Sequence, residues 1–138
     1  IKMSLKRIGT IEYTTTLRVL PAKDGKPKLE VTGLGGSGEL NGNKVIDSSA
    51  TYNAWLRSDG NWQGECPNSG IIILEDGIVT FSATGIGSPT EDGGNSWKGV
   101  TYFETSAGSI SQLNGKCIVY NWDVDAQGVA VWELFEYS

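Results

Sequence analysis

The sequence predicts an all-β protein that folds as a single closed antiparallel β-barrel of about eight strands. The chain has 138 residues, among them 19 glycines and one methionine, and its many Val, Ile, Thr, Trp and Tyr residues favour strands and tight turns over helices. Alternating segments recur at intervals of roughly ten residues, with no strong amphipathic helix between them. The segment 117–137 also carries large apolar side chains on both faces, which is expected for a strand pair with no face left for water.

A β-sandwich is the alternative architecture, because it is also built from short, evenly spaced strands. We favour the barrel because glycine-rich bends are spread along the whole chain, and because closure removes exposed strand edges. The length suits one domain, residues 1–138, which is long enough to bury roughly two thirds of its unfolded surface.

The first predicted strand spans residues 10–19, and residues 21–27 form the polar turn that follows it. A short apolar alternation at Leu29 and Val31 then completes a hairpin. The apolar face of the first strand is formed by every second residue: Ile11, Tyr13, Thr15, Leu17 and Val19.

Four glycines follow within residues 33–38. A phosphate-binding loop would need a helix after this run and a Gly-Lys-Ser or Gly-Lys-Thr ending, and the sequence has neither. We therefore expect the glycines to permit a sharp bend or a close approach of another backbone. Asn41 and Gly42 are a strong hairpin dipeptide, and residues 47–57 form the next long strand.

The middle of the chain contains a short strand at 62–66, a turn at 67–70, and a hairpin that pairs 71–74 with 78–83. Residues 88–96 are polar and contain one proline and two glycines, which predicts a mobile surface loop. Such a loop either closes over a cavity or serves as a long connection.

Residues 97–105 return to strand and 106–111 turn before the final hairpin, whose own turn lies at 125–128. Alternation divides the large side chains of this hairpin between two faces. One face has Cys117, Val119, Val129, Val131 and Phe135, and the other has Ile118, Tyr120, Trp122, Val124, Trp132 and Leu134.

The charge balance excludes several partners. Sixteen acidic and eleven basic residues give a net charge of −5, so the chain as a whole is repelled by nucleic acid and by anionic membranes. No apolar run reaches the roughly 20 residues of a membrane helix, and residues 1–11 lack the features of a signal peptide. We expect a soluble cytoplasmic protein, and a secretory segment removed upstream is the alternative.

The chain contains no histidine and only two cysteines, Cys66 and Cys117. The lack of histidine removes the commonest general base and metal ligand. Two cysteines without histidine are too few for a zinc site, so we expect no metal and no cofactor. Buried free thiols suit a reducing compartment, and a disulfide between them stays open as the alternative.

Carboxylates are then the only plausible acid and base groups. The catalytic candidates are Glu133, which alternates with Val131 and Phe135, and Glu104, which lies beside two aromatic residues. A carboxylate inside an apolar barrel has a raised pKa unless it is paired, whereas one at the rim reaches water. Polar side chains that could accompany a ligand inside the barrel are Tyr102, Tyr120, Asn53 and Asn121.

Three short segments carry a resemblance to a known family. They are residues 32–38, the strand 49–52, and the turn 113–115 before the last hairpin. In these segments the chain resembles small uncharacterised bacterial proteins with an allene-oxide-cyclase-like barrel. The resemblance implies an eight-stranded antiparallel barrel, similar to a lipocalin in outline, often in an oligomer. For the plant cyclases it implies a nonpolar cavity that binds a fatty-acid epoxide, but no catalytic residue of theirs matches this sequence.

Three hypotheses about function follow, and the sequence alone leaves open whether the protein is an enzyme. The first is a barrel that binds a small apolar molecule without established catalysis. The second is a cofactor-free isomerase or cyclase that uses Glu133 or Glu104. The third is a homo-oligomeric interaction protein in which Trp122 and Trp132 are interface anchors.

Overall fold

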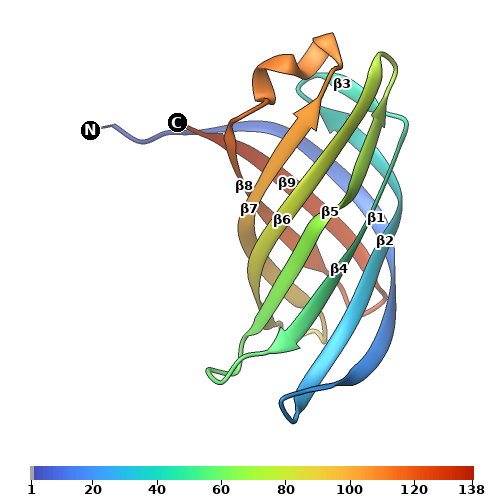
Figure 1. The fold of residues 1–138 in the computed structure, drawn as a ribbon, viewed down its shortest axis with the longest axis vertical. Helices are drawn as coiled ribbons and strands as arrows, with labels where there is room; N and C mark the ends of the chain where they lie inside the picture. The colour runs from blue at the N-terminus through green and yellow to red at the C-terminus, as the bar shows by residue number, and fades with distance from the viewer. Residues whose placement is uncertain (1) are drawn as a thin grey trace.

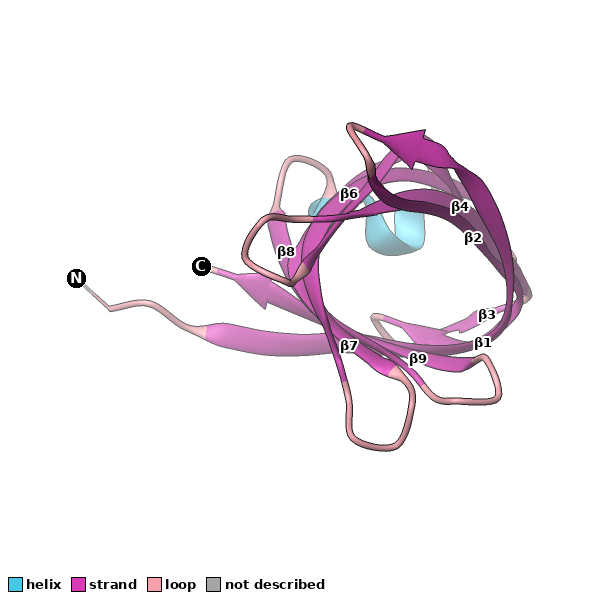
Figure 2. Ribbon diagram, turned by 90° about the horizontal axis from the view of Figure 1, so that it is seen from below, coloured by secondary structure: helices cyan, strands magenta, loops and turns pink. Residues whose placement is uncertain are grey.

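The computed structural model describes residues 2–138 and confirms a closed antiparallel β-barrel (Figure 1). The barrel closes because β1 pairs with both β9 and β2, while the short β3 is an extra strand that pairs with the end of β2. Figure 2 shows the ring of strands seen along the barrel. The strands are β1 (Leu5–Lys23), β2 (Lys26–Leu40), β3 (Asn43–Val45), β4 (Asp47–Leu56), β5 (Trp62–Leu74), β6 (Gly77–Pro89), β7 (Asn95–Thr105), β8 (Cys117–Val124) and β9 (Val129–Tyr137).

The predicted turn at 67–70 is wrong, because β5 continues through it. Cys66 pairs with Ala83 and Gly70 pairs with Phe81, so three residues of β5 face the single Ser82 of β6. Asn68, in the middle of this bulge, has a φ of 52°. A bulge leaves its extra residues unpaired while the strand runs on, which explains why the turn-forming Pro67 does not end the strand.

The predicted mobile loop at 88–96 is also wrong. Strand β6 extends to Pro89 and β7 begins at Asn95, so only a tight turn lies between them. The Thr90 N–H donates to the Gly94 carbonyl at 2.9 Å, and the Gly94 N–H donates back to the Thr90 hydroxyl at 3.0 Å. A turn locked in this way is too short to cover a cavity.

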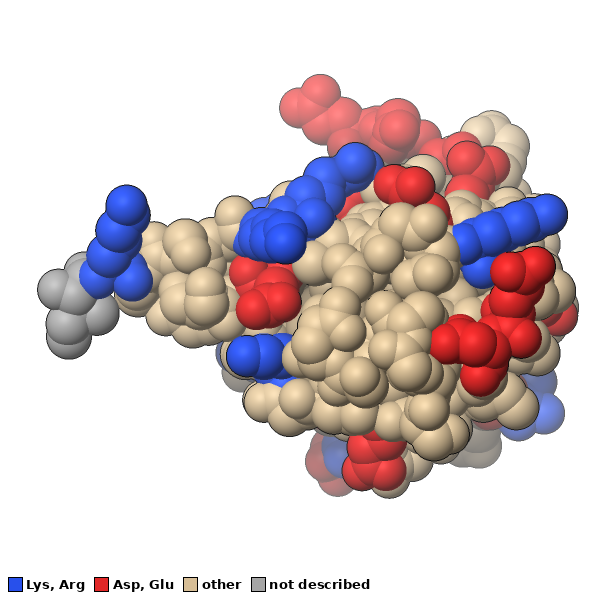
Figure 3. Space-filling model, turned by 90° about the horizontal axis from the view of Figure 1, so that it is seen from above, with Lys and Arg blue, Asp and Glu red and all other residues tan. Residues whose placement is uncertain are grey.

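One end of the barrel is closed by the short 3-10 helix η1 (Gly108–Leu113), which lies where the sequence predicted only a turn. Two of its own residues, Ile110 and Leu113, are buried, as is Ala107 just before it. Seen from above this end, the charged side chains lie around the edge, and uncharged atoms cover the centre (Figure 3).

The two faces of the final hairpin are as predicted, and the structure shows which face is inside. Ile118, Trp132 and Leu134 are buried in the core, whereas Val119 and Phe135 lie on the outer wall and are only partly buried. Trp132 is 4% exposed and Trp122 packs against the core from inside the barrel. These two tryptophans therefore cannot anchor an interface between copies.

Glycines on the inner wall make room for aromatic rings. A Cβ atom at Gly87 would lie 2.5 Å from the Trp97 ring, and one at Gly64 would lie 2.6 Å from the same ring. Gly85 and Gly99 lie beside the Tyr120 hydroxyl. A Cβ atom added at either glycine would lie 2.6 Å from the hydroxyl oxygen. Glycine thus lets large rings lie flat against the neighbouring strands.

The opposite end of the barrel is open. Strand β1 pairs with β9 only as far as Thr14 but stays paired with β2 as far as Lys23, so the β1–β2 hairpin projects past the barrel wall. Leu17 and Val19 alternate with the inward-facing Ile11 and Tyr13, yet they are 60% and 74% exposed because no wall stands opposite them. The open mouth therefore has an apolar border.

Candidate ligand-binding site

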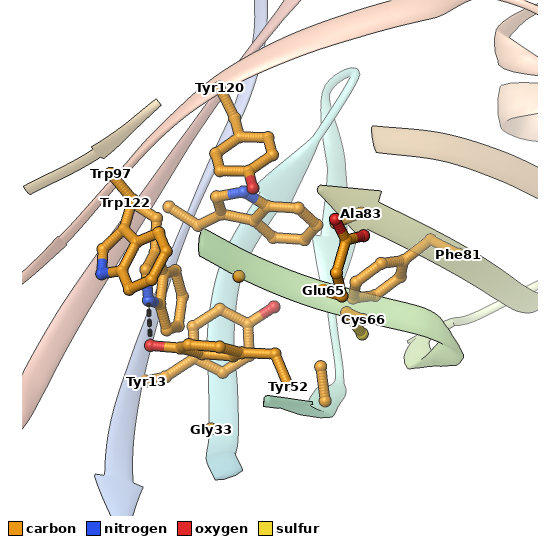
Figure 4. Close-up of a pocket in the computed structure, with 13 residues that line it drawn as sticks. Tyr13, Gly33, Tyr52, Glu65, Cys66, Phe81, Ala83, Trp97, Tyr120 and Trp122 are labelled. Atoms are coloured by element: carbon orange, nitrogen blue, oxygen red, sulfur yellow. Dashed lines mark hydrogen bonds between the residues drawn. The ribbon is translucent and has the colours of Figure 1, made fainter. Parts of the chain in front are cut away.

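The interior of the barrel contains a cavity lined mainly by aromatic rings (Figure 4). Its open volume is about 60 Å³. Small residues from β2, β4, β5 and β6 leave the space that the rings do not fill. The rings are Tyr13, Tyr52, Phe81, Trp97, Tyr120, Trp122 and Trp132, and the small residues are Gly33, Ala50, Gly64, Cys66 and Ala83.

The size of the cavity limits what it holds. One water needs about 10–15 Å³ of such open space, so the cavity corresponds to about four to six waters. Clefts for drug-sized ligands are much larger, at roughly 300–1,000 Å³. The space therefore suits a molecule built around one small ring, not a long chain enclosed along its length.

The rings brace one another, so the cavity is formed before any ligand arrives. Tyr13 meets Trp122 edge to face at 5.2 Å between ring centroids, and Tyr52 meets Trp97 in the same way at 5.6 Å. Trp132 lies 4.9 Å from Phe81 and 5.8 Å from Tyr120. Edge-to-face contacts add to the stability that burial provides, so each ring is held in one orientation.

Two of the three tyrosine hydroxyls in the cavity wall have protein acceptors. The Tyr13 hydroxyl lies 2.7 Å from the Ser48 hydroxyl, which in turn donates to the Ile71 carbonyl at 2.8 Å. The Tyr120 hydroxyl donates to the Thr84 carbonyl at 2.9 Å. Burial raises the pKa of both tyrosines, so both stay neutral at physiological pH.

Tyr52 differs, because its hydroxyl oxygen accepts a hydrogen bond from the Trp122 indole N–H at 3.0 Å (Figure 4). Burial raises the pKa of Tyr52 to about 12. Tyr52 is therefore a neutral phenol whose oxygen is already occupied as an acceptor and whose hydrogen remains to be donated.

Cys66 and Glu65 are neighbours in the wall with opposite orientations. The buried Cys66 side chain faces the interior, where burial raises the pKa of its thiol, and both cysteines of the chain are free. The Glu65 carboxylate accepts hydrogen bonds from Gln63 Nε2 at 2.9 Å and from Thr84 Oγ1 at 2.8 Å. Because Thr84 is exposed and is paired directly opposite Glu65, this carboxylate belongs to the outer face.

The two carboxylates predicted as catalytic candidates also lie on the outer face. Glu133 is half-buried beside Arg7, with 3.7 Å between Arg7 Nε and Glu133 Oε2. Glu104 is exposed and is paired with the exposed Thr80. Neither lines the cavity, so the structure does not bring either carboxylate to a ligand held there.

Of the four predicted polar ligand residues, the structure brings only Tyr120 to the cavity. Tyr102 is 54% exposed on the outer wall. Asn53 is paired opposite Glu65 on the outer face. Asn121 is on the same face, where its Oδ1 accepts from Lys98 Nζ at 3.3 Å.

Sequence reasoning missed Tyr52 and Trp97 as cavity residues. The available signal was the alternation of ring and small side chains on one face of a strand, as in Ala50, Tyr52 and Ala54. The matching signal for Trp97 was the pair Gly85 and Gly87, two residues apart on the neighbouring strand. A large residue next to alternating small ones marks an inward face with open space.

Other kinds of site find no support in the part of the chain that the structure describes. Residues 2–138 contain no group of three His, Cys, Asp or Glu side chains that could hold a metal ion. The same residues include no helix long and apolar enough to cross a membrane.

Comparison with known proteins supports the fold. No protein-family model matches the chain, and no curated protein matches it. A conserved protein of unknown function from Rhodopseudomonas palustris has the same architecture, with a TM-score of 0.82, 14% identity, and coverage of 100% of this chain and 99% of that chain. A β-barrel-like protein from Acinetobacter baumannii gives a TM-score of 0.80 with 12% identity, covering 100% and 98%.

An enzyme from Penicillium herquei is less similar, with a TM-score of 0.63 and 14% identity over 97% of this chain and 95% of that chain. Identities this low establish the fold and carry no function with them. The chain thus has the barrel architecture of bacterial proteins whose function is unknown.

Proposed function

We propose that this protein binds a small apolar molecule in the cavity of the barrel. The observation that carries the proposal is a preformed, ring-lined space whose only charged lining residue, Glu65, has its carboxylate held by Gln63 and Thr84 on the outer face. Apolar pockets with a few convergent polar groups are the usual form of small-molecule sites. The open end of the barrel, with its apolar border at Leu17 and Val19, provides the route of entry.

The resemblance to allene-oxide-cyclase-like barrels agrees with an apolar cavity. It does not extend to catalysis, because the one carboxylate among the lining residues, that of Glu65, is held by Gln63 and Thr84 on the outer face, and Glu133 lies outside the cavity beside Arg7. The Penicillium herquei enzyme shows that the fold also serves catalysis. For this chain, binding without catalysis accounts for the residues that line the cavity better than a cyclase does.

Filling the cavity is expected to abolish ligand binding. In Ala83→Met, a flexible apolar side chain enters the space from β6. We expect the affinity for a single-ring apolar ligand such as ethylbenzene to fall at least tenfold. The free energy of unfolding should fall by no more than about 3 kcal/mol, the upper end of the usual cost of overpacking. Titrations followed by nuclear magnetic resonance of the protein measure the affinity.

The matched control is Ile86→Met, which places the same side chain on the exposed face of the same strand. This variant should bind as the unaltered protein does. Equal binding by Ala83→Met would show that the ligand sits elsewhere, and a failure of the unaltered protein to bind any single-ring apolar molecule would end the proposal.

A homo-oligomer is the second candidate, and the outer face of β7, β8 and β9 favours it. Val100, Val119 and Phe135 are paired side by side across these strands, and all three are only partly buried. Further along the same wall, Leu5 and Tyr137 are paired and exposed. A continuous apolar strip on an outer wall is typical of a surface that contacts another protein copy.

Phe135→Glu is expected to shift such an oligomer to monomers, because it places a charge at the centre of the strip. Native mass spectrometry at micromolar concentration measures the subunit number. Lys98→Glu, on the outer wall beside Asn121, is the control for charge alone and should leave the subunit number unchanged. If the unaltered protein is monomeric at this concentration, the homo-oligomer is excluded.

A further inference from the structure

The cavity wall has a hydrogen-bond donor that no protein group uses. Trp132 is 4% exposed and faces the interior of the barrel. Its indole N–H donates no hydrogen bond to any acceptor among residues 2–138. Every fully enclosed side-chain nitrogen and oxygen of the described residues does have a partner. The Trp132 Nε1 atom must therefore reach open space, and the open space beside Trp132 is the cavity.

Tyr52 is a second unused donor in the same wall. Its oxygen accepts from Trp122 Nε1 at 3.0 Å, and its own hydrogen has no acceptor among the described residues. A hydroxyl that accepts one hydrogen bond is polarised and donates the next more strongly. Since Tyr52 is neutral at physiological pH, it keeps this hydrogen under all ordinary conditions.

The wall has no comparable unused acceptor. The Tyr120 hydroxyl is engaged with the Thr84 carbonyl, and Tyr13 with Ser48. The nearby Glu65 carboxylate is held on the outer face by Gln63 and Thr84. A ligand with an ammonium group would find no anion inside, and a ligand with a carboxylate would find no cation, so either charge would be buried unpaired at high cost.

We infer that the ligand is a neutral, mainly apolar molecule with one hydrogen-bond acceptor oxygen, such as the carbonyl of a small ketone, aldehyde or ester. The Tyr52 hydroxyl donates to that oxygen, and the Trp132 indole N–H is a further donor in the same space. This inference rests on the proposed function, because it names the class of ligand for the same cavity.

Three single-ring molecules of similar size test the inference: acetophenone, ethylbenzene and benzoate. The first has a neutral acceptor, the second has none, and the third is an anion. The five tryptophans supply five indole N–H resonances in a nitrogen-labelled sample. We expect acetophenone to bind at least about fivefold more tightly than ethylbenzene, as one net hydrogen bond provides, and benzoate not to bind. Acetophenone should also shift the Trp122 and Trp132 resonances.

Tyr52→Phe removes the donor and keeps the ring. It should lower the affinity for acetophenone about fivefold and leave that for ethylbenzene unchanged. The matched control is Tyr102→Phe, which loses the same hydroxyl from the exposed outer wall, away from the cavity, and which should keep the preference for acetophenone.

The outcomes separate the inference from the proposed function. Equal affinities for ethylbenzene and acetophenone in the unaltered protein would overturn the ligand class and leave the cavity as a binding site. Tight binding of benzoate would also overturn it. A Tyr52→Phe variant that keeps the preference would remove Tyr52 from this role. If none of the three molecules binds, both the inference and the proposed function fail. The comparison within the unaltered protein needs no variant to fold.

Discussion

Replacing Trp132 by alanine is expected to lower the free energy of unfolding by about 3–5 kcal/mol, as for large aromatic residues in other cores. Trp132 packs against Tyr13, Phe81 and Tyr120, and it also contacts Phe103 and Trp122. Since domains of this size are stable by only about 5–15 kcal/mol, the variant would be close to unfolding. Urea denaturation followed by circular dichroism measures the change.

Trp55→Ala is the matched control, because it removes the same kind of side chain from the end of β4, outside the buried core. The Trp55 ring lies outside the cavity, beneath the Lys23 ammonium at 4.9 Å from its centroid. Such an exposed cation–π contact contributes about 0.5–1 kcal/mol. If the Trp132 variant lost no more stability than the Trp55 variant, or remained folded but changed only its subunit number, the placement of Trp132 in the core would be wrong.

The fold was predictable because the strand alternation is regular. The hairpin of residues 71–74 with 78–83 is present with Leu74 paired to Gly77, and the final hairpin has the two predicted faces. The alternation did not reveal that β5 continues past Pro67, because turn-forming residues also occur in bulges. It also gave no signal for the short β3, whose pairing depends on where the end of β2 lies.

The site was less predictable, because both faces of the last hairpin are apolar. Alternation placed Glu133 with Val131 and Phe135, but it could not say whether this face or that of Trp132 was inside. The choice is made by pairing across the whole sheet, where Trp132 stands in register with Trp122 and with Ile11. Tyr52 and Trp97 were not identified because their neighbours across the barrel are distant in the sequence.

Gly87→Ala is expected to lower the free energy of unfolding by about 1–3 kcal/mol, the usual cost of overpacking. The new methyl carbon would lie 2.5 Å from Cδ2 and Cε2 of Trp97, which are ring-fusion atoms and not the end of a flexible chain. The ring cannot move aside easily, because it also covers Gly64 and meets the Tyr52 ring at 5.6 Å. Gly108→Ala, where no atom lies within 4 Å of the Cβ position, should change the stability by about 0.5 kcal/mol or less.

A double-mutant cycle shows whether the ring is the cause of the Gly87 effect. The three atoms nearest to the Cβ position at Gly87 all belong to Trp97, so the clash should vanish when Trp97→Leu removes the ring. In that background Gly87→Ala should become neutral or stabilising by up to about 1 kcal/mol, because alanine restricts the unfolded chain more than glycine does. Such a change of sign would show that Gly87 is needed because a side chain there would clash with the Trp97 ring. If the backbone conformation itself required glycine, Gly87→Ala would destabilise the protein equally with and without the Trp97 ring.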